Sequence, residues 1–418
     1  MKKLISRNHI AFAAAGMILA SALPVFPAAA ADAPSVLILG DSISSGDGLK
    51  AGECGYYDYV ADCTGGTLTN LAKSGSTTSD VIAVIDDAAN KDTIADADII
   101  CISAGGNDLM QPAKAYFETL AKEGENLIDT AKRIVKEGDR VSMLLAVNGK
   151  IKPSRKEAQA NYIKIVEKLR EMNPDAQIIF ETLYNPFEIS PDAVKARGYS
   201  DEDYGYLKNI INSHEDYLNN VMRAIAGVPL KRELGDTIKV NEVEVEKAEG
   251  VKVADVETAF EENGWLYNRI LEKDIHPTPL GHALIAATVL DQIGDTNIQS
   301  AALAETVANL KQSVFTQIPA DDYSVISKYA VGVQYLKGDF DNSGQVSIED
   351  VQDLLRVYTN GVSGKKIEDN VTARQFVTGD VNGDGSISID DVQYLLIYYV
   401  KRNVSHANVD WDDILPKK

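Results

Sequence analysis

The sequence predicts an α/β domain, with a parallel sheet covered by helices on both faces, followed by a small helical domain. Short β-branched runs alternate with amphipathic helical stretches from residue 35 to about residue 295. The composition changes at Gly338, and the phrase that begins there returns 41 residues later. We therefore expect a leader at 1–31, an α/β domain at 32–296, a linker at 297–336 and a repeat domain at 337–418.

The leader has the features of a secretory signal peptide. Lys2, Lys3 and Arg7 precede a short apolar core and a run of small residues, so we expect cleavage after Ala30 or Ala31. The apolar core is too short to favour a transmembrane helix. Cleavage takes the formal net charge from −21 to −24, which disfavours nucleic acid as a partner. We expect a secreted protein without a transmembrane segment in the mature chain.

Three cysteines fit an exported chain that holds no zinc site. Cys54 and Cys63 flank a polar loop and are the candidate pair for a disulfide. Cys101 lies in an apolar run and is expected to be a buried thiol. No histidine lies near the paired cysteines at a zinc-binding spacing.

The clearest strands and helices indicate where a site would form. Strands are predicted at 35–40, 97–104 and 176–183, and helices at 155–172 and 203–227. In open parallel sheets, ligands bind outside the carboxyl ends of the strands. Residues that directly follow the strands are therefore the first candidates for function.

The repeat contains a loop suited to calcium. Residues 338–358 and 379–399 both align with the twelve-residue calcium loop, with oxygen-bearing positions around a turn glycine, Gly344 or Gly385. The candidate ligands are Asp339, Asp341, Ser343, Gln345 and Asp350 in the first loop, and Asp380, Asn382, Asp384, Ser386 and Asp391 in the second. One such loop could be an Asx-turn alone, whereas two copies favour two Ca²⁺ ions.

This duplicated loop and helix resembles a type I dockerin, the module that attaches enzymes to the cohesin domains of a cellulosomal scaffoldin. Position 12 is Asp rather than the Glu of ordinary calcium hands. The resemblance implies a cohesin partner that is contacted through Ile348, Glu349, Ile389 and Asp390. These apolar–acidic pairs leave the cohesin type open. Val351, Leu354, Val392 and Leu395 are expected in the core of the module, and Leu355 and Leu396 suit either the core or the surface.

Four separate blocks of the first domain carry residues suited to acyl transfer. Ser42 follows the first strand, Gly75 lies in a polar loop, Asn107 follows a later strand, and His276 lies in a late loop two residues after Asp274. Taken singly, each has an ordinary structural interpretation as a cap, turn or loop residue. Together they supply a nucleophile, a base, an orienting acid and oxyanion donors, the last being the N–H groups of Ser42 and Gly75 and the Asn107 amide.

These blocks, "GDSISSG", "AKSGST", "GGND" and "DIHPTPLGH", resemble the SGNH, or GDSL-type, esterase superfamily over roughly residues 35–295. The resemblance implies a flavodoxin-like three-layer fold, no catalytic cofactor, and the roles above for Ser42, Gly75, Asn107 and His276. The family's acid usually lies three residues before the histidine, where this chain has Lys273. Asp274 is therefore the predicted acid, and a dyad assisted by a backbone carbonyl is the alternative.

The remaining histidines are expected to be structural. His282 falls inside a helical pattern, and His214 and His406 are assigned to the surface by default.

The dockerin resemblance favours an esterase that removes acetyl groups from plant cell-wall polysaccharide, within an extracellular or cell-surface cellulosome. The segment "ETLYNPF" at 181–187 resembles lysophospholipase-like members and supports an acyl hydrolase of lipid esters as the alternative. A non-catalytic glycan-binding protein, docked through the calcium module, is the third hypothesis.

Overall fold

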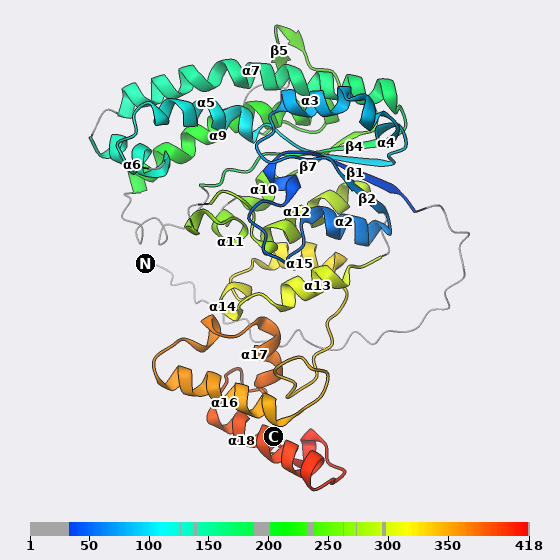
Figure 1. The fold of residues 1–418 in the computed structure, drawn as a ribbon, viewed down its shortest axis with the longest axis vertical. Coiled ribbons are helices and arrows are strands. Elements are labelled where there is room, and N and C mark those ends of the chain that lie inside the picture. The colour runs from blue at the N-terminus through cyan, green and yellow to red at the C-terminus, as the bar shows by residue number, and fades with distance from the viewer. Residues whose placement is uncertain are drawn as a thin grey trace, which may run out of the picture. The chain divides into compact units, whose positions relative to one another are not determined.

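This computed structural model describes residues 33–125, 127–137, 140–187, 201–231, 237–261, 263–272, 274–294 and 298–416 (Figure 1). The leader predicted at 1–31 lies outside the described residues. Across these described ranges, no helix combines the length and the apolar character needed to cross a membrane. The chain forms an α/β unit of residues 33–310 and 316–333, and a C-terminal unit that contains residues 311–315 and 334–418.

Five parallel strands form the central sheet in the order β2-β1-β3-β4-β7. The strands are β1 (Ser35–Gly40), β2 (Thr67–Asn70), β3 (Ile99–Ser103), β4 (Gln177–Glu181) and β7 (Val251–Ala254). This is the strand order of flavodoxin-like sheets, in which β1 and β3 flank the switch point where ligands bind. The predicted α/β fold class is confirmed.

The three strands expected from the sequence are the three inner strands of this sheet. β1, β3 and β4 are almost entirely buried, so each reads as a continuous apolar run. β2 and β7 form the two edges and are short. Edge strands need fewer apolar residues, which explains why these two gave no clear signal.

Helices cover both faces of the sheet, as Figure 1 shows. One face carries α3 (Thr78–Asp86), α4 (Lys91–Ala95), α5 (Gly106–Glu118), α6 (Leu127–Glu137), α7 (Arg140–Met172) and α9 (Asp201–Ala226). The other carries α2 (Tyr56–Thr64), α10 (Val256–Phe260), α11 (Gly264–Tyr267) and α12 (Pro279–Ile293). A short helix α1 (Ser42–Ser45) follows β1, and β5 (Lys239–Val240) and β6 (Val243–Glu244) form a small hairpin.

The segment expected as a linker, 297–336, is largely helical and belongs mostly to the α/β unit. It contains α13 (Ala301–Ala308) and α15 (Ala320–Tyr329), both of which contact α12. Leu303 and Ile326 are fully buried. The linker prediction is wrong because these amphipathic helices bury their apolar faces in the same unit.

The expected disulfide between Cys54 and Cys63 does not form, and both cysteines are free. Cys54 precedes α2 and Cys63 lies near its end, so the nine steps along the chain from one to the other span about 13 Å at the helical rise of ~1.5 Å per residue. Cα atoms more than ~7 Å apart cannot be bridged. Cys63 instead directs its sulfur to the carbonyl oxygen of Tyr329, at 3.6 Å. Cys101 is fully buried, as predicted.

The C-terminal unit has a small apolar core between α16 (Ile348–Val362) and α18 (Ile389–Tyr399). It also contains α14 (Gln312–Phe315) and α17 (Ala373–Gly379), which precedes the second loop. The four residues predicted for the core, Val351, Leu354, Val392 and Leu395, are all buried. Leu355 and Leu396, which suited either place, are each 41% exposed.

Candidate active site

Ser42 is the first residue of α1, directly beyond the carboxyl end of β1. Asp41 caps this helix, accepting a hydrogen bond from the N–H of Ile43 at 3.1 Å, and its own N–H donates to the Ser103 carbonyl at 3.0 Å. A Cβ on Gly40 would lie 2.1 Å from that same carbonyl oxygen, so only glycine allows this close approach of β1 and β3. The first N–H groups of a helix have no partner within it, which leaves the Ser42 N–H suited to an oxyanion.

Two further oxyanion candidates lie on adjoining segments. Asn107 lies at the start of α5, and its side-chain amide donates one hydrogen bond to the Ser76 carbonyl at 3.0 Å. A primary amide has two N–H donors, so a second is left for substrate. Gly75 adopts φ +79°, and Gln111 of α5 donates to its carbonyl at 2.9 Å. These two bonds hold the loop of Gly75 against the helix that carries Asn107.

His276 and Asp274 form a direct hydrogen-bonded pair. The imidazole Nδ1 lies 2.5 Å from Asp274 Oδ1, and the His276 backbone N–H donates to the same oxygen at 3.1 Å. The Tyr184 hydroxyl donates to the Ile275 carbonyl at 2.6 Å, which fixes the residue between them. With Nδ1 engaged, Nε2 is the ring nitrogen left for a nucleophile. Asp274 is therefore in place to orient the ring.

Ser42, Asn107 and His276 line one pocket at the carboxyl ends of the strands. Asp274 joins this group through its bond to His276. Gly75 lines a separate polar depression beside α3, together with Lys73 and Ser76. The structure thus brings four of the five predicted residues to one place and holds Gly75 on the neighbouring loop.

Two buried carboxyl groups near this pocket were not assigned a role from the sequence. Glu181, the last residue of β4, lines the pocket, and burial raises its pKa to about 8. Burial likewise raises the pKa of Asp41 to about 7, which the hydrogen bond from Ile43 partly opposes. In the sequence, the feature that points to Glu181 is its position directly after an apolar run, near the end of a predicted strand.

His214 was expected at the surface and is instead buried, 4% exposed, where it lines the same pocket. It lies on α9, between Asn148 at 2.7 Å and Arg155 at 3.4 Å. Burial, with the Arg155 charge, lowers the pKa of His214 to about 4. The assignment of His214 to the surface is wrong because Asn148 and Arg155 provide polar partners for its imidazole within the helical layer. His282 is fully buried in α12 and His406 is exposed, as expected.

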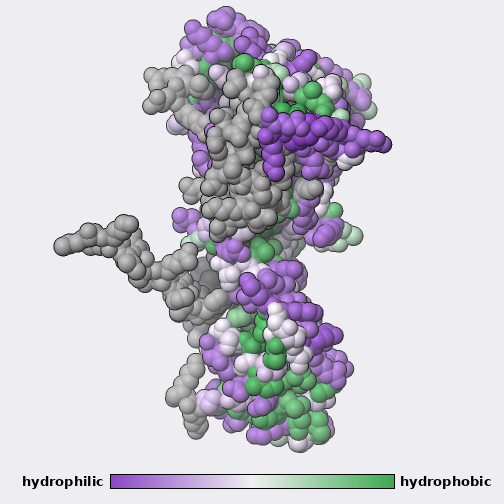
Figure 2. All heavy atoms as spheres, turned by 90° about the vertical axis from the view of Figure 1, so that its left-hand side faces the viewer, coloured by the Kyte–Doolittle hydropathy of each residue, from purple (hydrophilic) through white to green (hydrophobic). Residues whose placement is uncertain are grey.

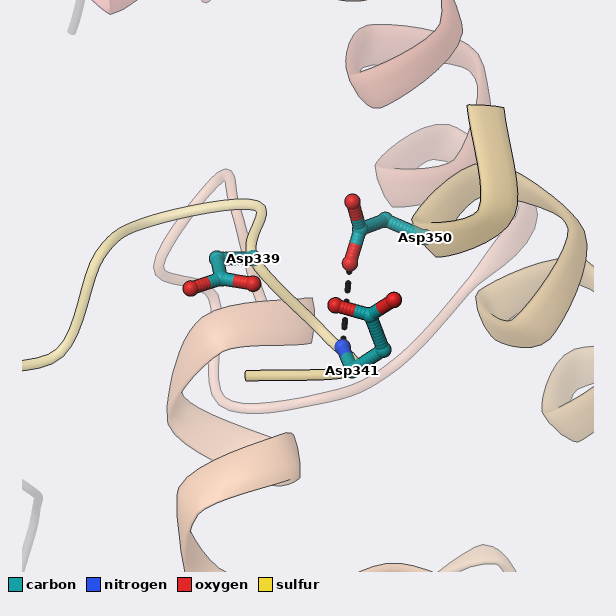
Figure 3. Close-up of side chains that lie close together, drawn as sticks. All are labelled: Asp339, Asp341 and Asp350. Atoms are coloured by element: carbon teal, nitrogen blue, oxygen red, sulfur yellow. Dashed lines mark hydrogen bonds between the residues drawn. The ribbon is translucent and has the colours of Figure 1, made fainter. Parts of the chain in front are cut away.

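The first calcium-type loop gathers three carboxylates. Asp339, Asp341 and Asp350 each offer an oxygen within 4.8 Å of the others, and Figure 3 shows the three groups close together. The Asp341 N–H donates to Asp350 Oδ1 at 2.9 Å, the bond drawn in Figure 3. Gly344 and Gly385 adopt φ +87° and +86°, which fits their predicted place at the turns. Anionic oxygen donors are the ligands that Ca²⁺ takes, so this cluster fits the ion.

Comparisons with known proteins place most of the first unit in one family. Residues 38–284 match the model described as the GDSL-like Lipase/Acylhydrolase family. A protein of Bacillus subtilis (strain 168), named "Uncharacterized protein YpmR", is 23% identical over 62% of this chain and 80% of its own length. The lipase Lip_vut3 from a goat rumen metagenome is 22% identical, covering 63% of this chain and 99% of its own, with a TM-score of 0.40. An extracellular lipase of Streptomyces rimosus is 22% identical, covering 62% and 99%, with a TM-score of 0.42.

Proposed function

Because this chain belongs to the GDSL-like lipase/acylhydrolase family, we propose that it hydrolyses carboxylic esters with Ser42 as nucleophile, His276 as base and Asp274 as orienting acid. The observation that carries the proposal is the 2.5 Å bond between His276 Nδ1 and Asp274 Oδ1. It leaves Nε2 free in a pocket that Ser42 also lines. No catalytic cofactor is required by this set of groups.

The reaction follows from these groups. Ser42 Oγ attacks the ester carbonyl while His276 Nε2 takes its proton, and Asp274 stabilises the imidazolium that forms. The N–H groups of Ser42 and Gly75 and the amide of Asn107 donate to the carbonyl oxygen as it gains charge. The imidazolium then protonates the departing alcohol, and water, activated by the same imidazole, releases the acid and restores Ser42.

The walls of the pocket favour an acyl chain longer than acetyl. Side chains of α5, α7 and α9 make one side of it, namely Leu109, Met110, Phe117, Val147, Ile151 and Ile211. Each CH₂ group that leaves water gains about 0.8 kcal/mol, whereas an acetyl group has only a methyl to bury. We therefore place the hydrolysis of lipid-like acyl esters first. Acetyl esters of polysaccharide, favoured by the dockerin resemblance, are the second candidate.

A series of p-nitrophenyl esters from acetate to dodecanoate tests whether long acyl esters are preferred to acetyl esters. We expect kcat/KM to rise by about fourfold per CH₂ until the pocket is filled. Ala113 lines the pocket, so Ala113→Phe shortens the preferred chain and leaves acetate turnover intact. Ser42→Ala is inactive, and Ser79→Ala, an exposed serine of α3, retains full activity. A constant preference for acetate would support the polysaccharide esterase instead, and polysaccharide binding without turnover would support the glycan-binding hypothesis.

For the C-terminal unit we propose two Ca²⁺ ions, held by the ligands predicted from the two loops, and a cohesin partner. Large apolar side chains exposed on and after α18 support a docking role, and Figure 2 shows apolar residues gathered on this unit. They are Ile389, Leu396, Ile397, Val400 and Val404. Secretion and assembly into a cellulosome complete the proposal. Calorimetry with purified cohesins tests it, because binding must be lost in Ile389→Asp and retained in Val243→Asp, an exposed apolar residue of the other unit.

Asp274→Asn tests the choice of acid at its unusual position. The amide cannot fix the same imidazole tautomer, so we expect kcat to fall on the order of 1000-fold or more with KM little changed. Asp86→Asn is the matched control, since Asp86 is an exposed acid of α3 that pairs with Lys168 at 2.6 Å. A near-normal rate in Asp274→Asn would point to the dyad assisted by a backbone carbonyl.

A further inference from the structure

Arg269 is a buried cation whose main chain bonds to both members of the acid–base pair, Asp274 and His276. It is 7% exposed and lies between α11 and α12. Its N–H donates to the His276 carbonyl at 2.9 Å, and its carbonyl accepts from the Asp274 N–H at 3.2 Å. The Thr278 N–H donates to the Tyr267 carbonyl at 2.8 Å, so the two stretches run antiparallel as a narrow hairpin. The main chain of Arg269 therefore anchors Asp274 and His276 together.

The Arg269 side chain connects this hairpin to the segment that follows the nucleophile. Its Nη2 lies 3.3 Å from Glu53 Oε2, and Glu53 also accepts from the Lys50 N–H at 2.8 Å. Its Nη1 lies 3.4 Å from Glu272, in the turn before Asp274. The guanidinium thus pairs with Glu53, in the segment that follows the nucleophile, and with Glu272, in the turn before Asp274. An ion pair with little exposure is screened less by solvent than one at the surface.

The same segment passes directly over the acid–base pair at Gly48. A Cβ at this position would lie 3.0 Å from His276 Cβ and 3.5 Å from both Arg269 Nε and Asp274 Oδ2. Gly48 adopts φ +86°, so a side chain is excluded both by strain and by space. Among the residues that the structure describes, Arg269 Nε is buried without a hydrogen-bond partner. Asp274 Oδ2 is the carboxylate oxygen that does not bond His276.

We propose that Arg269 is a positioning residue, which ties the Asp274–His276 hairpin to the segment after Ser42 through its main chain and its ion pair with Glu53. The inference rests on the proposed function, because it explains how an acid two residues before the histidine is held. A carboxylate at that position shares a tight turn with the histidine and needs outside support to keep its orientation. Arg269 supplies that support through main chain and side chain at once.

The full chain with Arg269→Gln tests the proposal through kinetics and proton NMR. We expect kcat to fall on the order of 100-fold while KM stays nearly constant, because a small displacement of the base affects the transition state alone. The Nδ1–H proton of His276, shifted far downfield by its bond to Asp274, should broaden or vanish. His276→Gln assigns that resonance. Arg269→Lys keeps the charge without the planar fork and should recover part of kcat.

Arg170→Gln is the control for loss of an arginine charge, and Arg170 is half-buried. Arg170 donates to carbonyls of Asn173 and Ala176 before β4, at the end of the strands opposite the site, and its loss should leave kcat and the resonance unchanged. If Arg269→Gln fails to fold, Glu53→Gln removes only the ion pair and should lower kcat in the same direction. A folded Arg269→Gln that keeps both kcat and the downfield proton would overturn the proposal. A wild-type chain with the resonance but no ester turnover counts against the proposed function instead, since the resonance does not depend on turnover.

Discussion

Glu181 shows how one buried side chain couples the site to pH. It is 2% exposed at the end of β4, and its Oε1 has no hydrogen-bond partner among the described residues. Burial raises its pKa to about 8, the nearby charge of Asp41 adds to this, and a hydrogen bond with Tyr56 opposes it. The folded chain therefore keeps a proton on Glu181 that the unfolded chain releases at a lower pH.

The stability of the folded chain depends on pH through this carboxyl group. Between the ordinary pKa of 4.5 and about 8, the folded state binds more protons than the unfolded state, so stability falls as pH rises through this window. Glu181→Gln keeps the shape of the side chain without its charge. It should therefore abolish a decrease of up to ~5 kcal/mol in the free energy of unfolding at high pH. Urea unfolding at pH 5, 7 and 9 measures this. Glu171→Gln, an exposed acid of α7, is the control, and an equal pH dependence in both variants would contradict the assignment.

At the scale of elements, close packing decides where the acid–base hairpin lies. Gly281 lies in the first turns of α12, which Thr278 caps by accepting from the Gly281 N–H at 3.1 Å. A Cβ on Gly281 would lie 1.9 Å from the Tyr267 carbonyl oxygen. The missing side chain allows α12 to approach the strand-like segment that pairs with residues 276–278. The helix and the catalytic hairpin are therefore positioned by one contact.

This contact predicts opposite effects for two helical Gly→Ala changes. Alanine normally favours a helix over glycine by about 1 kcal/mol, so Gly149→Ala in α7, where nothing lies within 4 Å, should be stabilising. Gly281→Ala should instead lower the free energy of unfolding by about 1–3 kcal/mol, because Tyr267 must move. Thermal unfolding of both variants measures the difference. Equal stabilisation in both would show that α12 can shift without cost.

Across the whole molecule, the two units differ in how much core they have. The α/β unit has an extended core that includes three inner strands, whereas the C-terminal core consists of seven buried residues. A core of that size gives little stability without further support. Carboxylates brought as close as those of Asp339, Asp341 and Asp350 also repel one another until a cation neutralises them.

Chelation should therefore unfold residues 338–400 selectively. Treatment with EDTA is expected to reduce helical circular dichroism and open this region to proteases, while the α/β unit stays resistant. Excess Ca²⁺ should reverse both effects, and Asp339→Ala with Asp380→Ala should reproduce them without a chelator. Unchanged dichroism and cleavage after EDTA would refute the calcium assignment.

The sequence by itself determined the parallel α/β class, the three inner strands, the repeat-domain core and the segments that supply Ser42, Asn107 and His276. These features depend on short-range patterns, since a buried strand or a loop after it is encoded within a few residues. Only the tertiary structure decided that Asp274 reaches His276, that Cys54 and Cys63 stay apart, that His214 is buried and that α13 and α15 pack on α12. Each of these depends on the packing and geometry of the folded chain, which no local pattern of residues records.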